Sequence, residues 1–428
     1  MGTVLRGGTV VELEPAAVEV VDLRVEHGHI TARGQDLPAQ LGDEVIDVRG
    51  KVVMPGLVCG HHHLYRTLAR GMPLAAAAAQ THWERTEGTL WKLDAALDLD
   101  AVQTAATAAG LEALAFGTTT VLDHHASPKA VRGSLLRVAR GLNDVGLRGA
   151  LCYEVSDRHG AVVREEALEE TVGFQKKAKG RFRGMVGAHA SCTLSPDALE
   201  GLREAVNATG TGVHLHLAED PSDERISIER YGAPPVTRLA EAGLLSPKAL
   251  LAHAVHLSWP ELSQVLASGA WLVHNPRSNM ETQVGYAPAG KFGARALLGT
   301  DGLHADMWTE AQLASLRALD AGQPIDVVRY LANGHRLASQ LFEERIGPMR
   351  EGAVADLLVL DYRPPTPLTA ETLAAHLTAG MGPRGVEAVM VDGLWRMWGR
   401  RPLSVNPDQV SEQTREVARA VWARAAAG

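Results

Sequence analysis

The chain has 428 residues, of which 46% are hydrophobic and 21% charged, so it can bury a large core and suits one large domain plus a smaller one. The net charge of −8 argues against nucleic acid or an anionic membrane as the main partner, because both require a basic surface. Three cysteines, none at Cys-x-x-Cys spacing, exclude a disulfide framework and a zinc ribbon. The odd, sparse set of cysteines indicates a reducing cytoplasm. The first residues lack a signal-peptide pattern, and the apolar stretch Leu74–Ala79 is too short to cross a bilayer.

The first fifty residues predict short strands, because β-forming residues cluster there between glycine-rich turns. These strands are expected at 9–11, 18–23, 29–33 and 44–48. A further buried strand is expected over Lys51–Gly60, with Pro55-Gly56 as punctuation inside it.

The middle of the chain, residues 55–345, predicts alternating strands and helices. After the strand before His61, apolar strands are expected at 117–124, 148–155, 185–190, 212–218, 249–255, 271–274 and 296–300. Helices are expected at 99–116, 133–145, 196–208, 235–242, 259–268 and 309–321. Eight strands alternating with helices are typical of an α/β fold of the (β/α)₈ type, the TIM barrel.

The tail returns to strands. A turn and a strand are expected over 352–361, a strand with a hairpin turn over 386–393, and a last helix over about 408–426. The two strand-rich ends, 1–54 and 346–403, are therefore expected to pair into one small β-domain. It would flank the barrel of residues 55–345, and residues 404–428 would form a C-terminal helix.

Residues that can bind a metal or move a proton follow the predicted barrel strands. They include His61–His63, Asp123–His125, His189, His214–Glu219, His253 and Asp301–His304. Active sites of such barrels lie at the carboxyl ends of the strands. Core packing does not explain why a polar residue that can bind a metal or a proton stands at the end of each strand. The carboxyl-terminal face of the barrel is therefore the predicted active site.

Four of these residues can hold one metal ion. His61 and His63 are two residues apart, so on a strand their side chains point to the same side. His216 adds a nitrogen from across the barrel and Asp301 an oxygen, which leaves an open position on Zn²⁺ or Fe²⁺. A lone His-x-His pair is usually a surface or core feature without a metal. That interpretation is weakened here, because His216, Glu219, His253 and Asp301 follow in the right order.

Glu219 and His253 are the candidates for proton transfer and charge stabilisation. Glu219 follows His216 by three residues, where a carboxylate can accept a proton from the activated water. The alternative for Glu219 is a helix N-cap or a surface acid. His253 can orient the nucleophile or stabilise developing charge, and its alternative is a core histidine hydrogen-bonded to backbone.

The candidate residues stand in a series of sequence motifs. The first motif reads Met54-Pro-Gly-Leu-Val-Cys-Gly-His-His-His-Leu64. The others follow in order as Gly117-Thr-Thr-Thr-Val121, His214-Leu-His-Leu-Ala-Glu219, His274-Asn-Pro-Arg-Ser-Asn279 and Gly299-Thr-Asp-Gly302. Together they resemble the amidohydrolase superfamily, and within it the cytosine deaminase and chlorohydrolase (ATZ/TRZ) branch. Trp91-Lys-Leu-Asp94 and Asp123-His-His-Ala-Ser-Pro128 make the chain most similar to the SsnA-type aminohydrolases.

The resemblance implies a TIM barrel with a flanking β-sandwich domain made from both termini. It implies one divalent metal, expected as Zn²⁺ rather than Fe²⁺, held by His61, His63, His216 and Asp301. It implies catalytic roles for Glu219 and His253, and we expect Asp301 to share the proton transfer with Glu219. A second metal is not expected, because residues 185–187 offer no lysine to carboxylate.

Substrate contacts are expected around this centre. The resemblance suggests His189, while His125, Trp91 and His304 are further candidates for pocket walls that could equally be structural. Family members that deaminate adenosine-like substrates often carry an acid in the helix after the first motif. Here that neighbourhood reads Trp91-Lys92, which argues against a nucleoside substrate.

The predicted reaction is hydrolytic deamination of an amino-substituted N-heterocycle, such as a purine, pterin, pyrimidine or triazine, with release of ammonia. The first alternative is dechlorination, or cleavage of an amide or ureido C–N bond, on the same scaffold. The second is a non-catalytic barrel that only binds. We expect a small-molecule substrate and a homo-oligomer, for example a dimer, with no nucleic-acid or membrane partner.

Overall fold

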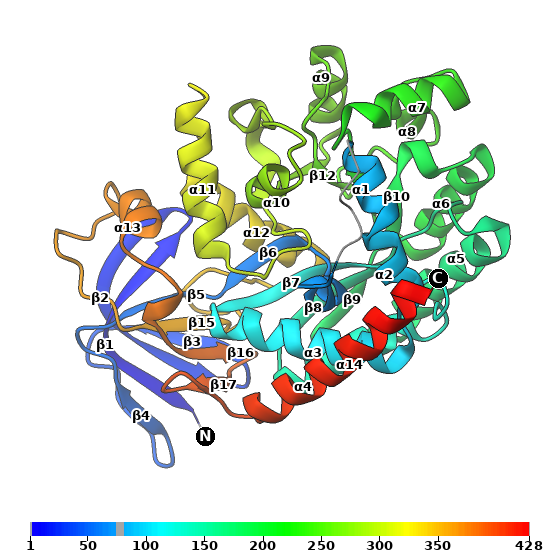
Figure 1. The fold of residues 1–428 in the computed structure, drawn as a ribbon. Helices are drawn as coiled ribbons and strands as arrows, with labels where there is room; N and C mark the ends of the chain where they lie inside the picture. Colours follow the sequence, from blue (N-terminus) through cyan, green and yellow to red (C-terminus); the bar gives the residue numbers. More distant parts are fainter. Residues whose placement is uncertain (1, 74–80, 428) are drawn as a thin grey trace.

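The computed structural model describes residues 2–73 and 81–427, so the stretch 74–79 discussed above lies outside the described residues. The middle of the chain has an α/β fold of the TIM-barrel type, and a large sheet built from both ends of the chain lies beside it (Figure 1). Among the described residues, none of the helices combines the length and the apolar character that a membrane crossing requires.

Within the described residues, nine strands from both ends form one sheet. They are β1 (Thr3–Leu13), β2 (Ala16–Glu26), β3 (His29–Gly34), β4 (Glu44–Asp47), β5 (Val52–Pro55), β15 (Leu357–Leu360), β16 (Val386–Val391), β17 (Leu394–Trp398) and β18 (Arg401–Pro402). β5 and β15 join the two groups as antiparallel neighbours, with Val53 opposite Val359. Both strand-rich ends therefore lie in one sheet, while their forming a separate sandwich domain stays a prediction.

The barrel strands form two parallel arcs in the described part of the chain. The first contains β6 (Leu57–His62), β7 (Thr118–His125), β8 (Arg148–Tyr153) and the short β9 (Phe182–Gly184). The second contains β10 (Val186–Ala190), β11 (Val213–Leu217), β12 (Leu250–His253), β13 (Trp271–His274) and β14 (Ala296–Leu298). Single parallel bridges connect the arcs, His62 with Asp301 and Val155 with Ala188. The first bridge brings the carboxyl end of β6 beside the residues that follow β14.

Most of the described helices lie between the barrel strands and cover the outside of the two arcs, whereas the last two follow strands of the end sheet (Figure 1). The described helices are α1 (His82–Gly88), α2 (Leu90–Ala96), α3 (Leu99–Ala115), α4 (Ser134–Val145), α5 (Gly160–Lys177), α6 (Pro196–Thr209), α7 (Pro221–Tyr231), α8 (Pro235–Glu241), α9 (Trp259–Ser268), α10 (Pro276–Glu281), α11 (Met307–Asp320), α12 (Val327–Phe342), α13 (Leu373–Ala379) and α14 (Pro407–Ala427). α6 shows why such a helix forms where it does. The Ser195 side chain caps its first turn, Pro196 is its first residue, and Gly210 ends it in the left-handed conformation.

The predicted single strand over Lys51–Gly60 is wrong, because Pro55-Gly56 divides it between two sheets. β5 pairs with β15 in the end sheet, whereas β6 pairs with β7 in the barrel. Gly56 is required at the crossing, since a Cβ there would lie 2.2 Å from Cγ2 of Thr119.

Candidate metal centre and active site

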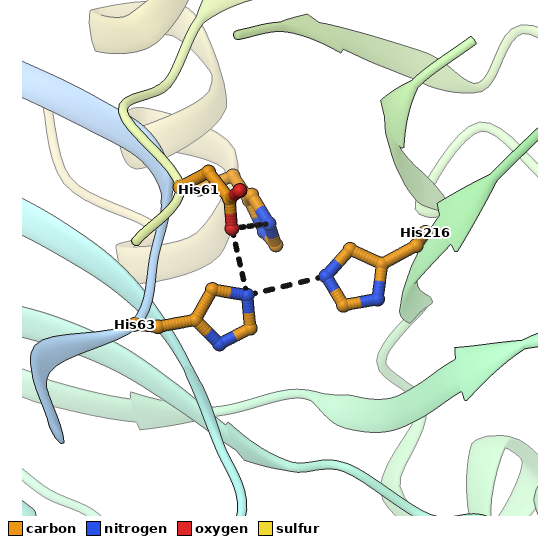
Figure 2. Close-up of side chains that lie close together, drawn as sticks. His61, His63 and His216 are labelled. Carbon is orange, nitrogen blue, oxygen red and sulfur yellow. Dashed lines mark hydrogen bonds and ion pairs between the residues drawn. The ribbon is translucent and has the colours of Figure 1, made fainter. Parts of the chain in front are cut away.

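Four predicted ligands converge where β6, β11 and β14 end. His61, His63 and His216 point toward one another, as Figure 2 shows. Nε2 of His63 lies 3.0 Å from Oδ1 of Asp301 and 3.2 Å from Nε2 of His216, and Nε2 of His61 lies 3.5 Å from the same Asp301 oxygen. All four side chains are buried, and one ligand atom from each lies within 4.8 Å of the others.

This arrangement fits a divalent cation. Nε2 of His61 is buried and has no hydrogen-bond partner among the described residues, although such groups are normally satisfied. Nitrogen and oxygen ligands at about 2.0–2.2 Å from one ion lie about 3 to 3.6 Å apart, which matches the separations seen here. Three imidazole nitrogens and one carboxylate are a donor set that Zn²⁺ and Fe²⁺ accept.

The ring nitrogens that face away from the centre are held in place. Nδ1 of His61 lies 2.8 Å from Nε2 of His214. His214 stands two residues before His216 on β11, so both side chains point to the same side of the strand. Nδ1 of His63 and of His216 lie 2.6 Å and 3.0 Å from backbone carbonyl oxygens to which they can donate. Such contacts fix the ring orientation and the tautomer, so the Nε2 lone pairs face the common point.

The protonation states also suit a cation. Burial lowers the pKa of His61 and of His216 well below the usual range, and that of His63 to about 4. The rings are therefore neutral at physiological pH and keep a lone pair for a metal. Burial pushes the pKa of Asp301 upward, but the positive charge of Arg66 and the neighbouring His61 and His63 outweigh it and hold that pKa well below its ordinary value.

Asp301 is positioned by more than its place after β14. The hydroxyl of Ser278 donates to its Oδ2, and NH1 of Arg66 lies 3.4 Å from its Oδ1. Its backbone has φ of +51°, and His253 at the end of β12 has φ of +75°. Both are in the left-handed region that non-glycine residues avoid, at a cost of about 1–3 kcal/mol each. Strain of this kind collects at functional sites, which agrees with the roles predicted for these two residues.

Glu219 and His253 face one another beside the ligands. Glu219 follows β11, and Asp220, not Glu219, is the N-cap of α7. Oε2 of Glu219 lies 3.7 Å from Nε2 of His253, and both residues have an atom within 4.8 Å of Asp301. Nδ1 of His253 contacts Oδ1 of Asn279 at 2.9 Å, so a side chain rather than backbone orients this ring. The arrangement places a carboxylate and an oriented imidazole next to the point on which the four ligands converge.

A cavity of about 430 Å³ opens over Asp301. Its volume falls within the range of small-molecule sites. Arg66, Ser278, Glu281 and His304 are among its lining residues. The cavity therefore gives a small substrate access to the carboxylate side of the metal centre.

The predicted substrate contacts fall into two groups, and their roles stay predictions. His304 lines the cavity, His189 lies 5.5 Å from the His216 ring, and Trp91 lies 6.1 Å from His189 (ring centroids). His125 is fully buried, contacts Oγ of Ser127 at 2.9 Å and does not line the cavity. Of the four, His304 lines the cavity and His189 lies near the ligand His216, whereas neither Trp91 nor His125 lines the cavity.

Sequence reasoning assigned no role to several residues that the structure brings to the site. Ser278, Asn279 and His214 support Asp301, His253 and His61, and all three stand inside motifs noted above. Their presence in those motifs was the available signal. Arg66 gave no comparable signal, because its approach to Asp301 depends on how β6 and β14 meet.

The helix after the first motif carries an acid after all. Asp94 in α2 is 2% exposed, and burial raises its pKa to about 7. It interacts with Tyr65 and does not line the cavity. Asp94 therefore does not supply an acid to the cavity, and the expectation against a nucleoside stays a prediction.

Comparison with known proteins gives a consistent picture. The model of the Amidohydrolase family matches residues 52–396. A 5-methylthioadenosine/S-adenosylhomocysteine deaminase of Desulforudis audaxviator is 32% identical over 93% of this chain and 94% of its own, and a 5'-deoxyadenosine deaminase of Methanosarcina mazei is 30% identical over 98% of each. Among solved structures, a zinc-bound adenosine deaminase from Xanthomonas campestris has a TM-score of 0.86 at 22% identity, covering 98% of both chains. The chain therefore belongs to the amidohydrolase family and is a hydrolase that acts on C–N bonds.

Proposed function

We propose that this enzyme deaminates an amino-substituted N-heterocycle, replacing the exocyclic amino group with oxygen and releasing ammonia. The observation that carries the proposal is the convergence of His61, His63, His216 and Asp301 on one point, with Glu219 and His253 facing it. Relatives of about 30% identity that are named as deaminases of adenosine derivatives support the same reaction. A barrel that only binds is set aside, because the family is one of hydrolases.

A divalent ion held by the four ligands supplies a Lewis acid that makes water nucleophilic near neutral pH. The carboxylate of Glu219 is placed to accept a proton from the attacking water and to deliver it to the ring nitrogen beside the reacting carbon. Nδ1 of His253 donates to Oδ1 of Asn279, so Nε2 keeps a lone pair and is placed to accept a hydrogen bond from the attacking water and orient it. Asp301 accepts the second proton of the water and passes it to the amino group, which then leaves as ammonia.

The test is a screen for ammonia release by protein loaded with Zn²⁺ or Fe²⁺. Adenosine, 5-methylthioadenosine, guanine, cytosine, pterin and the aminotriazine melamine cover the proposed class, with Glu219→Gln measured in parallel on each. We expect turnover of at least one compound by the wild type and a loss of that turnover in the variant. Chloride release from a chlorotriazine, or hydrolysis of a ureido compound, without ammonia release from any amino compound would contradict the proposal.

The finer predictions belong to the same proposal. We propose Zn²⁺ as the resident metal, since nitrogen ligands predominate. We also propose a homo-oligomer, and a reducing cytoplasm in keeping with three buried cysteines that form no disulfide among the described residues. The bridges between the two arcs support a closed (β/α)₈ barrel, and the shared sheet supports a separate β-sandwich domain.

A further inference from the structure

Arg66 lines the cavity and has no part in the mechanism above. It belongs to the short 3₁₀ helix η1 (Leu64–Ala69), which follows β6 directly. Its side chain is 17% exposed and lines the cavity together with Asp301. A cation therefore lies beside the reacting centre, where a bound substrate would displace the water around it.

The guanidinium group makes little use of its hydrogen-bonding capacity. Among the described residues, its one hydrogen bond runs from NH1 to Oδ1 of Asp301 and is long, at 3.4 Å. Its Nε is buried and has no partner within the described residues. An arginine offers five N–H donors, and leaving such donors unpaired after desolvation is costly. The terminal nitrogens therefore have the capacity to donate to an acceptor that enters the cavity.

Gly302 leaves the space in which Arg66 lies. A Cβ at Gly302 would be 2.5 Å from Cδ and 2.8 Å from NH1 of Arg66. The close approach involves the end of a flexible side chain, so an added methyl group would move the guanidinium rather than the backbone. The position of Arg66 over Asp301 thus depends on the absence of a side chain in the residue after the ligand.

We propose that Arg66 is a specificity residue, and that it binds a ring oxo group of the substrate. Arginine pairs well with planar oxygen acceptors. A ring oxo group is accompanied by a neighbouring ring N–H, for which Glu281 in the same cavity is an acceptor. The substrate class is accordingly an oxo-substituted aminoheterocycle. This inference rests on the proposed deamination and narrows its substrate.

The test compares matched pairs that differ only in the oxo group. They are guanine with 2-aminopurine, isocytosine with 2-aminopyrimidine, and cytosine with 4-aminopyrimidine. We expect kcat/KM of the wild type to favour an oxo compound by at least about 10²-fold over its partner, because a site built for an acceptor rejects the analogue that lacks it. Arg66→Met should remove most of that ratio, because kcat/KM should fall much further for the oxo compound than for its partner. Gly302→Ala should shift the ratio in the same direction.

Controls separate specificity from damage to the site. Arg203→Met removes an exposed arginine on α6 whose guanidinium pairs with Glu200 and which does not line the cavity, and it should keep the wild-type ratio. Metal content is measured for every variant, since Arg66 contacts the ligand Asp301. Calorimetric titration of guanine and 2-aminopurine into Glu219→Gln, with and without Arg66→Met, gives the same comparison without turnover.

The outcomes are distinguishable. Equal losses for both members of each pair in Arg66→Met, at normal metal content, overturn the specificity role. If S-adenosylhomocysteine is instead favoured over 5-methylthioadenosine and Arg66→Met removes that preference, Arg66 binds a carboxylate and the oxo assignment is wrong. If only the compounds without an oxo group release ammonia, the inference about Arg66 is overturned but the proposed deamination is upheld. Binding without an oxo preference, and without ammonia from any compound, overturns both.

Discussion

The metal centre and the rim of the cavity are adjacent but built differently. At the centre, His61, His63 and His216 are buried and each ring has its outer nitrogen held by a neighbour. At the rim, Arg66 and His304 are partly exposed and Glu281 is exposed. The centre lies at the ends of strands, whereas the rim belongs to the segments that follow them. Rigid strands thus hold the shared chemistry, and the connecting segments can vary the substrate without disturbing it.

The largest effect is expected from removing a ligand. His216→Ala deletes one of three imidazole nitrogens, so the metal should be lost on dialysis. Because the ion contributes several kcal/mol of transition-state stabilisation, turnover should fall at least about 10³-fold. Elemental analysis and ammonia release check both effects. Normal metal content in this variant would show that the centre is not the rigid unit described here.

Glu219→Gln should separate chemistry from metal binding. The amide keeps the size of the side chain but cannot carry the proton, so turnover should fall about 10²- to 10⁴-fold. Metal content and melting temperature should stay at wild-type values. Glu229→Gln on α7, where the acid is exposed and pairs with Arg225, is the matched control and should retain full activity. Near-normal turnover in Glu219→Gln would remove the proton-transfer role.

His214→Phe tests whether the contacts behind the ligands matter. Losing its contact with Nδ1 of His61 should weaken metal affinity about 10- to 100-fold, the usual effect of such partners. Competition with a chelator of known affinity measures this, and circular dichroism verifies the fold. Unchanged affinity would mean that the strands alone hold His61 in place.

The smallest effect is expected at the rim. His304→Ala should raise KM by up to about 10-fold, as expected for the loss of one hydrogen bond of ordinary strength, and leave metal content unchanged. Steady-state kinetics on the substrate found by the screen gives both parameters. A fall in kcat with unchanged KM would instead place His304 in the chemical step.

Much of the fold could be predicted, because strands and helices alternate with clear turn signals. The strands around His61, His216 and Asp301 appear within a few residues of their predicted positions. α5 escaped prediction because His159 provides no side-chain cap and its buried residues stand among many charged ones. The continuous apolar run over Lys51–Gly60 hid a change of sheet, which local patterns do not reveal.

The site could be predicted where strand periodicity decides which side chains meet. His61 and His63 share one side, and so do His214 and His216. The same alternation separates His125 from His124, whose Nε2 lies inside the barrel near the carbonyl oxygens of β10 and β11. By contrast, the approach of Arg66 to Asp301 and the space left by Gly302 arise only when the first and last strands meet.

The central claim is that one divalent ion at the ends of the strands performs the reaction. Its most direct test is metal content measured together with ammonia release, before and after removal of the metal with a chelator and on stepwise return of Zn²⁺. We predict one ion per chain, inactive metal-free protein, and full activity at one equivalent. Two ions per chain, or full activity in the metal-free protein, would contradict the account.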